Sequence, residues 1–196
     1  MLCFLEWHIL SGFGSPLQLE GSLGRGSRHI GKTMFYARLV WASIAFFAWQ
    51  GVRASEIRYE RIPSKALSRP MPVVVYLPDG YASSSQRYPV LYLLHGAGGD
   101  ERAWLSRGDI QEKADALVKS GAIPPTLIVM PGCPGCWWVD GAKDKAETAF
   151  WSDLVPGIDR SYRTIANRRG RLVAGLSAGG YGAVRFALRY PDRLVA

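Results

Sequence analysis

The sequence predicts an α/β fold, in which helices flank a mostly parallel sheet, and three observations support this class. Four short, mostly apolar runs have the length and composition of buried strands. Segments with the helical spacing of apolar residues lie between and after these runs. Glycine-rich turns come directly after two of the runs. The runs are residues 71–78, 88–94, 126–130 and 171–176, and the helical segments are residues 109–119, 149–162 and 181–190.

The composition of the 196-residue chain is that of one globular domain with a distinct N-terminal segment. Its hydrophobic fraction of 48% is enough for a sizeable core. The formal net charge is +8, but much of the excess lies in the first part of the chain, and the remaining basic residues are scattered with acids between them. Because no stripe combines basic and aromatic residues, we expect a solvated basic surface and no nucleic-acid partner.

The first 54 residues are predicted to lie outside the folded domain. Residues 1–33 carry many Gly and Ser without periodicity, which predicts disorder or an extension that precedes the true start at Met34. Residues 34–54 have a basic start, a short apolar stretch and small residues at Val52 and Ala54, as in a secretory signal. We therefore expect a secreted or periplasmic protein, with an uncleaved membrane anchor as the alternative.

The first two strands are expected after a polar lead-in segment. Residues 71–78 form an apolar run that is closed by Pro78-Asp79-Gly80. Residues 88–94 are almost continuously apolar, as expected for a strand that is covered on both faces. This second strand leads straight into the loop His95-Gly96-Ala97-Gly98-Gly99-Asp100.

The glycine-rich loop after the second strand predicts half of an oxyanion hole. Such a site needs two converging N–H donors, one after the nucleophile and one from the loop after an earlier central strand. We assign the first-loop donor to the N–H of Ala97, with Gly96 and Gly98 close by, and expect His95 to be structural. A phosphate-binding loop is disfavoured, because neither Gly-Lys-[Ser/Thr] nor Rossmann spacing accompanies the glycines.

The middle of the chain predicts a helix, a strand and a second helix. Ile110, Ala114, Leu117 and Val118 form the apolar face of the helix 109–119, and Asp109 is expected to cap it. Residues 126–130 form the third strand. The segment 149–162 is helical, since Phe150, Leu154 and Ile158 recur every four residues.

The loop at residues 131–145 holds two features that leave alternatives open. Cys133 and Cys136 form a lone C-x-x-C, which is a weak metal signal, and the Pro and Gly residues around it favour a local disulfide or two idle thiols over redox catalysis. Trp137 and Trp138 could line a substrate cleft or pack in the core.

The strongest chemical signal is Gly175-Leu176-Ser177-Ala178-Gly179, a Gly-x-Ser-x-Gly string between a strand and a helix. A serine at a sharp strand-to-helix turn needs small residues two before and two after it, so that strand and helix can pass closely. Ser177 would then be an exposed nucleophile, and the N–H of Ala178 would be the second oxyanion donor. The alternative is an ordinary turn with a surface serine.

The helix after Ser177 is expected to carry an apolar stripe and to stop at Pro191. The stripe consists of Tyr181, Val184, Ala187 and Leu188.

Three motifs occur in the order found in a known family, at residues 89–99, 153–164 and 174–183. From about Val73 onward the chain resembles the esterase family of α/β-hydrolases, which includes esterase D (S-formylglutathione hydrolase), feruloyl and acetylxylan esterases, siderophore esterases and mycolyltransferases. The resemblance implies an α/β-hydrolase fold, Ser177 as the nucleophile, and the N–H groups of Ala97 and Ala178 as oxyanion donors.

The motif order also sets an expectation about the catalytic triad. In this fold the acid and the histidine follow the serine, whereas residues 192–196 stand where the family would begin its next strand. The histidines of the chain are His8, His29 and His95. We therefore expect residues 55–196 to be the N-terminal part of an α/β-hydrolase domain, truncated after the nucleophile strand and helix. Without a triad acid and histidine it would have little or no activity alone.

The resemblance implies a serine hydrolase that cleaves carboxylic esters through an acyl-enzyme on Ser177. Its expected substrates are small esters or acylated or feruloylated carbohydrates. Two alternatives stay open: a mycolyltransferase-type acyltransferase, and a non-catalytic binding relic. No metal or organic cofactor is implied, a membrane contact is expected only if the signal segment is uncleaved, and the oligomeric state is left open.

Overall fold

The computed structural model describes residues 54–142 and 144–195. The predictions of a disordered or mis-assigned segment at residues 1–33 and of a signal peptide at residues 34–54 fall outside this part, apart from Ala54. No helix in the described ranges is long and apolar enough to span a bilayer.

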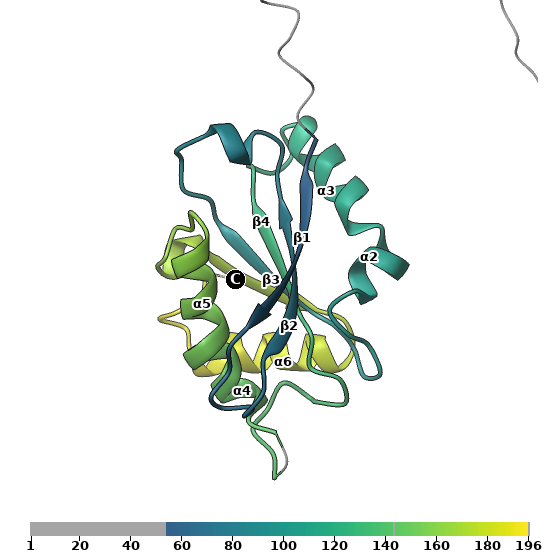
Figure 1. Ribbon diagram of the computed structural model, residues 1–196, viewed down its shortest axis with the longest axis vertical. Helices are drawn as coiled ribbons and strands as arrows, with labels where there is room; N and C mark the ends of the chain where they lie inside the picture. Colours follow the sequence, from purple (N-terminus) through teal and green to yellow (C-terminus); the bar gives the residue numbers. More distant parts are fainter. Residues whose placement is uncertain (1–53, 143, 196) are drawn as a thin grey trace, which may run out of the picture. The chain divides into compact units, whose positions relative to one another are not determined.

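A five-stranded sheet forms the centre of the described chain (Figure 1). Its strand order is β1-β2-β4-β3-β5, and β4 pairs in parallel with β3, which pairs in parallel with β5. The pairs β1/β2 and β2/β4 are antiparallel, so the sheet is mixed. This confirms the predicted α/β class. The strands are β1 (Glu56–Ile62), β2 (Met71–Leu77), β3 (Val90–Leu94), β4 (Leu127–Pro131) and β5 (Arg171–Gly175).

Strand β1 was not expected, because its sequence reads as a polar lead-in segment. It lies at the edge of the sheet and pairs along its whole length with β2, from Glu56 opposite Leu77 to Ile62 opposite Met71. Only Ile62 is buried in it, whereas Tyr59 is 61% exposed. Charged residues on an edge strand hinder its pairing with other chains. The same charges interrupt the apolar pattern by which a strand is recognised in the sequence.

Helices cover both faces of the sheet (Figure 1). On one side lie α2 (Ala103–Gly108) and α3 (Ile110–Lys119). On the other lie α6 (Ala178–Arg189) and a continuous helical segment made of α4 (Ala146–Ala149), the π-helical stretch η2 (Phe150–Leu154) and α5 (Val155–Ser161). Two 3₁₀ turns, η1 (Tyr81–Ser83) and η3 (Arg168–Gly170), complete the elements.

The two faces of β2 show how the core is divided. Val73, Val75 and Leu77 belong to the apolar cluster that contains Phe150, Leu154, Ile158 and Phe186, whereas Val74 and Tyr76 belong to the cluster that contains Ala114. This alternation follows from the two-residue period of a strand. Burial on both faces explains why the middle strands are continuously apolar in sequence.

The apolar stripe expected on the last helix is on the wrong face. Tyr181, Val184 and Leu188 are 51%, 61% and 77% exposed, whereas Gly182 and Phe186 are buried. The buried face instead consists of Ala178, Gly179, Gly182, Ala183 and Phe186. Gly179 lets α6 approach the backbone at the end of β3 closely.

The helix α3 also differs from expectation at its start. Asp109 occupies the N-cap position, but its backbone is left-handed (φ 49°, ψ 39°) and its side chain makes no capping bond. Leu117, expected on the apolar face, is 45% exposed, and Ala114 is the only buried residue of this helix.

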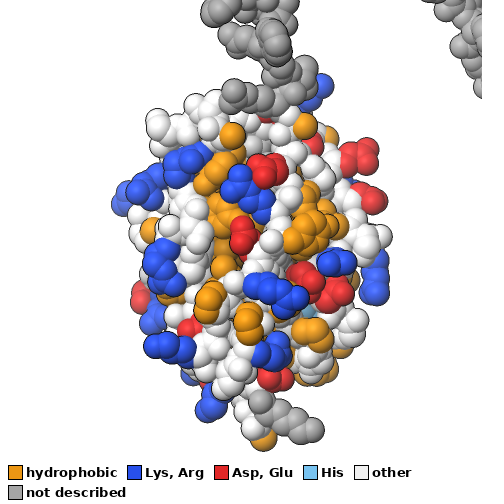
Figure 2. Space-filling view, in the orientation of Figure 1, with side chains coloured by type: hydrophobic (Ala, Val, Ile, Leu, Met, Phe, Trp, Pro, Cys, Tyr) orange, Lys and Arg blue, Asp and Glu red, His pale blue; other side chains and the backbone are white. Residues whose placement is uncertain are grey.

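Charged side chains are mixed on the surface that faces the viewer in Figure 2. Basic groups are spread over this face with acidic and apolar groups between them. A mixed distribution of this kind does not form the continuous basic track that nucleic acid requires.

Candidate active site

Ser177 lies in the sharp turn between β5 and α6. Its backbone has φ 53° and ψ −117°, a conformation that non-glycine residues adopt rarely and at a cost of about 1–3 kcal/mol. A Cβ atom on Gly175 would come within 2.9 Å of the Gly179 Cα, and one on Gly179 within 2.7 Å of the His95 carbonyl oxygen. The two glycines therefore let strand and helix pass at a distance that no larger residue permits.

The glycine-rich loop after β3 forms a tight turn beside Ser177. The N–H of Gly99 donates to the carbonyl of Gly96 at 3.0 Å, and Gly98 has φ 74°, which favours glycine. A Cβ atom on Gly96 would lie 3.3 Å from the Ser177 Cβ. Within the described residues, the backbone N–H groups of Ala97 and Ala178 donate to no protein acceptor. Neither N–H is therefore committed within this part of the chain, but Ala97 lines the cavity described below, whereas Ala178 is only 1% exposed and does not.

A cavity of about 210 Å³ joins the two turns. It brings together Ser177, His95, Gly96 and Ala97 of the predicted site. Its remaining walls come from α2 and from the residues around the two turns: Gly99, Ala103, Trp104, Arg107, Gly108 and Leu176. A larger hollow of about 600 Å³ lies against β1 and α3, but it shares no lining residue with the two turns.

His95 is buried, with 2% of its surface exposed, and both ring nitrogens are used. Its Nε2 accepts the N–H of Cys133 at 3.0 Å, and its Nδ1 lies 2.8 Å from the carbonyl oxygen of Gly96. Because a carbonyl can only accept, the proton is on Nδ1. Neither nitrogen is available to take a proton from Ser177, so His95 cannot be its general base.

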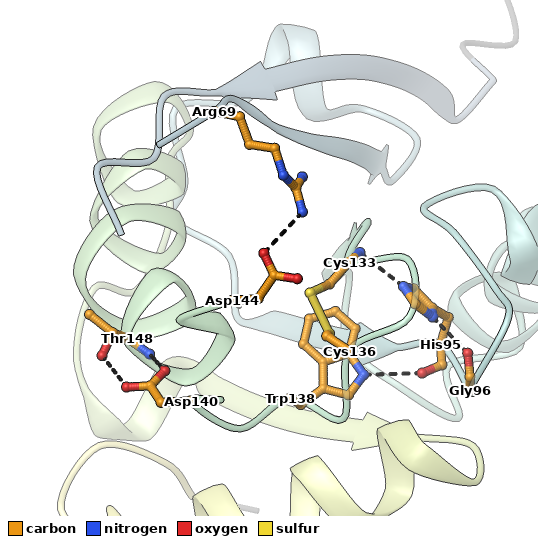
Figure 3. Close-up of a disulfide and its surroundings, with 9 residues drawn as sticks. All are labelled: Arg69, His95, Gly96, Cys133, Cys136, Trp138, Asp140, Asp144 and Thr148. Atoms are coloured by element: carbon orange, nitrogen blue, oxygen red, sulfur yellow. Dashed lines mark hydrogen bonds and ion pairs between the residues drawn. A yellow bond between two sulfur atoms is a disulfide. The ribbon is translucent and has the colours of Figure 1, made fainter. Parts of the chain in front are cut away.

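Trp138 packs in the core and does not line a substrate cleft, which decides between the two alternatives that its sequence left open. Its side chain is completely buried, and its Nε1–H donates to the carbonyl of His95 at 3.1 Å (Figure 3). The neighbouring Trp137 is 56% exposed and lies edge-on to Tyr181 at 6.2 Å, outside the cavity walls. Trp138 is therefore a core residue, whereas Trp137 lies on the surface.

Cys133 and Cys136 form a disulfide, with Cα atoms 5.6 Å apart, which selects one of the alternatives that the C-x-x-C motif left open (Figure 3). Across residues 54–142 and 144–195, no group of three or more His, Cys, Asp or Glu side chains is arranged to hold a metal ion.

The far end of this loop is tied to α4 by Asp140. Its carboxylate accepts the N–H of Thr148 at 2.9 Å and the hydroxyl of Thr148 at 2.6 Å (Figure 3). Burial alone would raise the pKa of Asp140, but these hydrogen bonds outweigh it and hold the pKa below its usual value.

Two cavity residues were not identified from the sequence, Trp104 and Arg107 on α2. The indole Nε1 of Trp104 is buried without a hydrogen-bond partner among the described residues. Arg107 is the one charged side chain in the cavity wall. The available signal was their spacing of three residues just after the glycine-rich loop, which places them on one side of a helix.

The comparisons with known proteins agree with this geometry. The sequence profile of the family described as "Putative esterase" matches residues 64–195. "Esterase Rv1288" of Mycobacterium tuberculosis (strain ATCC 25618 / H37Rv) is 36% identical over 138 residues, which cover 67% of this chain and 29% of that protein. An "Endo-1,4-beta-xylanase/feruloyl esterase" of Xylanibacter ruminicola is 34% identical over 60% of this chain and 18% of its own length.

Solved structures show the same fold. A ferulic acid esterase superposes with a TM-score of 0.69 at 34% identity, covering 72% of this chain and 58% of that one. S-formylglutathione hydrolase from Staphylococcus aureus superposes with a TM-score of 0.57 at 20% identity, covering 71% and 55% of the two chains. The chain thus spans less than two thirds of the length of the proteins it matches. With the profile matching most of its residues, the chain belongs to the esterase family and has an α/β-hydrolase fold.

Proposed function

We propose that this domain hydrolyses carboxylic esters, with Ser177 as the nucleophile. The observation that carries the proposal is the cavity, in which Ser177 stands in a strained turn beside a second turn that offers the free N–H of Ala97. The free N–H of Ala178 follows Ser177 directly in the chain, although Ala178 does not line the cavity. Attack of the Ser177 oxygen on an ester carbonyl would form a tetrahedral oxyanion. The N–H groups of Ala97 and Ala178 would stabilise it before the alcohol leaves, and water would then release the acid.

A histidine other than His95 must activate Ser177 in this mechanism, because both nitrogens of His95 are occupied. His8 and His29 fall outside the described residues. A serine hydroxyl without a positioned base is a weak nucleophile. We therefore propose that the 196-residue chain, taken alone, turns over activated esters only at trace rates.

The proposed substrates are esters of aromatic acids, on carbohydrate or on a small alcohol. The cavity offers the indole of Trp104 as an apolar wall and the guanidinium of Arg107 as a cation that can stack on an aromatic ring. Two of the relatives carry feruloyl or ferulic acid esterase in their names, which supports the same acyl class. Comparing 4-nitrophenyl ferulate with 4-nitrophenyl acetate tests this, and equal kcat/KM for both would contradict it.

Labelling with a fluorophosphonate probe tests the nucleophile. We expect slow labelling of the wild-type chain and none of Ser177→Ala, since the probe reacts with an activated serine oxygen. Added imidazole should accelerate labelling of the wild type alone, because it can act as the general base that we propose the chain, taken alone, does not provide. Equal labelling of Ser177→Ala would place the reactive group elsewhere, and rapid labelling without imidazole would show that the chain already holds a base.

We also propose that the protein is exported by way of residues 34–54. The Cys133–Cys136 disulfide supports this, because such bonds persist in oxidising compartments. N-terminal sequencing of the mature protein is the test: a first residue at Ser55 is expected, and an intact Met1 would refute cleavage.

A further inference from the structure

We propose that residues 133–138, here called the brace loop, position both halves of the oxyanion hole, with Cys133, Trp138 and His95 as positioning residues. The proposal rests on the proposed function, since it concerns the same two N–H donors. It assigns a purpose to the disulfide and to the buried tryptophan, neither of which touches the cavity around Ser177.

The first contact of the brace loop is with the side chain of His95. The N–H of Cys133 donates to Nε2, and this leaves Nδ1–H to donate to the carbonyl of Gly96 (Figure 3). The ring therefore links the brace loop to the first residue of the turn that presents the N–H of Ala97. Loss of the Cys133 contact would allow the other tautomer, in which Nδ1 no longer donates to Gly96.

The second contact is with the backbone of His95. The indole N–H of Trp138 donates to the His95 carbonyl at 3.1 Å, and the two rings meet edge-on with centroids 5.1 Å apart. The side chain and the carbonyl of one residue are thus held by opposite ends of the brace loop. Cys133, His95 and Trp138 are all buried, so water cannot readily replace the two bonds that the brace loop makes to His95.

The third contact reaches the nucleophile helix. A Cβ atom on Gly182 would lie 2.5 Å from the Trp138 Cβ, which shows that the tryptophan packs directly on the backbone of α6. Gly182 is one helical turn after Ala178, the second predicted oxyanion donor. Trp138 therefore contacts both His95, which precedes the first turn, and α6, which follows the second, and the N–H groups of these two turns must be aimed at one oxygen atom.

The disulfide closes the first four residues of the brace loop into a ring. It joins Cys133 to Cys136, and the N–H of Cys136 also donates to the Cys133 carbonyl at 3.1 Å. Trp138 keeps a left-handed backbone (φ 59°), a strained conformation that persists where the surroundings determine it. Opening the disulfide should release Cys133 first, and with it the fixed tautomer of His95.

The test compares three forms with the wild type: the reduced protein, the double variant Cys133→Ser/Cys136→Ser, and Trp138→Phe, which keeps a ring but loses the N–H. Asp140→Asn is the matched control, because it weakens the same 131–145 loop at its contact with Thr148 and touches neither His95 nor α6. Circular dichroism establishes that each form is folded, and re-oxidation should restore the reduced sample.

Two readouts separate the brace from the catalytic proposal. Nitrogen-15 NMR of His95 should show Nδ1–H in the wild type and in Asp140→Asn, and mixed tautomers in the disulfide-free forms. Amide hydrogen exchange at Gly99 and Gly179, whose N–H groups donate to the carbonyls of Gly96 and Leu176 within the two turns, should accelerate about tenfold in the same forms and in Trp138→Phe. Neither readout needs turnover, so both test the positioning role of the brace loop even if Ser177 proves unreactive.

The third readout is the imidazole-assisted reaction with a 4-nitrophenyl ester. We expect kcat to fall by about 10-fold or more with KM nearly unchanged, because oxyanion donors act mainly in the transition state. In other serine hydrolases, complete removal of one donor lowers kcat by about 10²–10³. Unchanged tautomer, exchange and kcat in folded forms that lack the disulfide or the Trp138 N–H would overturn the proposal. A rise in KM with unchanged kcat would also count against it, because it would mean that substrate binding and not the oxyanion hole had been weakened.

Discussion

Gly179 is the residue on which the close approach of α6 to β3 depends. A methyl group there would press on the backbone carbonyls of Leu94 and His95, which cannot move without moving the two turns of the site. We expect Gly179→Ala to lower the free energy of unfolding by about 2–3 kcal/mol and to abolish probe labelling of Ser177. Urea unfolding and fluorophosphonate labelling measure the two effects.

Gly121→Ala serves as the control for this substitution. Gly121 has φ 74°, yet a Cβ atom there would meet nothing within 4 Å. Only the left-handed backbone is then penalised, at about 1–2 kcal/mol, and labelling should not change. A similar loss of labelling in both variants would mean that general destabilisation, not the contact with β3, is responsible.

At this scale the sequence predicted the residues whose role depends on backbone sterics. The spacing of Gly175, Ser177 and Gly179 and the run of glycines after β3 identify two turns, because only small residues allow such conformations. Trp138 and Trp104 could not be placed in the same way. Which side a large aromatic residue faces depends on packing between segments distant in sequence, and a loop has no period that reveals it.

Among the elements, α4 and α6 are joined through one buried carboxylate. Glu147 is 4% exposed, and it accepts hydrogen bonds from Arg185 at 3.0 Å and from the Tyr190 hydroxyl at 2.7 Å, with Arg189 at 3.2 Å. We expect Glu147→Ala to lower the free energy of unfolding by about 2 kcal/mol, since charge-assisted bonds of a buried group are lost. Urea unfolding measures the change.

Glu56→Ala is the matched comparison, because Glu56 pairs with Arg58 at 2.8 Å on an exposed edge strand. Exposed pairs contribute little to stability because water screens them, so this variant should unfold almost as the wild type does. Equal destabilisation by the two variants would show that burial of Glu147 adds nothing.

The elements themselves were predictable to the degree that their sequence pattern is local. Strands β2, β3 and β4 were found because burial on both faces makes them continuous apolar runs. Strand β5 is only partly buried, and it was found with the help of the Gly-x-Ser-x-Gly turn that follows it. The edge strand β1 was missed because pairing on one side only and exposed charges remove that signal. The predicted orientation of α6 was wrong because its buried face consists of Gly and Ala residues with the single large side chain of Phe186, and a hydrophobic pattern underestimates such a face.

Across the whole molecule, three tyrosine hydroxyls join distant segments. Tyr76 donates to Asp115, Tyr162 to Glu60 and Tyr190 to Glu147. Burial, followed by the bonded carboxylate, raises the pKa of Tyr76 and Tyr162 above the ordinary 10.0, and for Tyr190 the bond to Glu147 is the main cause. Protonated tyrosines are thus favoured in the folded state.

Alkaline unfolding should follow from these three residues. A group whose pKa is raised on folding contributes stability that is complete below its unfolded pKa, about 10 for Tyr. That contribution is lost as the pH rises through the folded pKa. Exposed tyrosines such as Tyr59 can ionise in the folded protein, so we expect the absorbance at 295 nm to rise in two phases, and the second phase to coincide with loss of circular dichroism above pH 10. Full ionisation with an unchanged dichroism spectrum would contradict this.

The position of β4 fixes when the sheet can be completed. It lies between β2 and β3, although it follows both in the chain. β2 and β3 are therefore about 10 Å apart, which is twice the spacing of neighbouring strands, and they cannot form backbone hydrogen bonds with each other. During synthesis, the centre of the sheet must wait until residues 127–131 have emerged from the ribosome and entered the gap, and the turn that carries Ser177 is made later still.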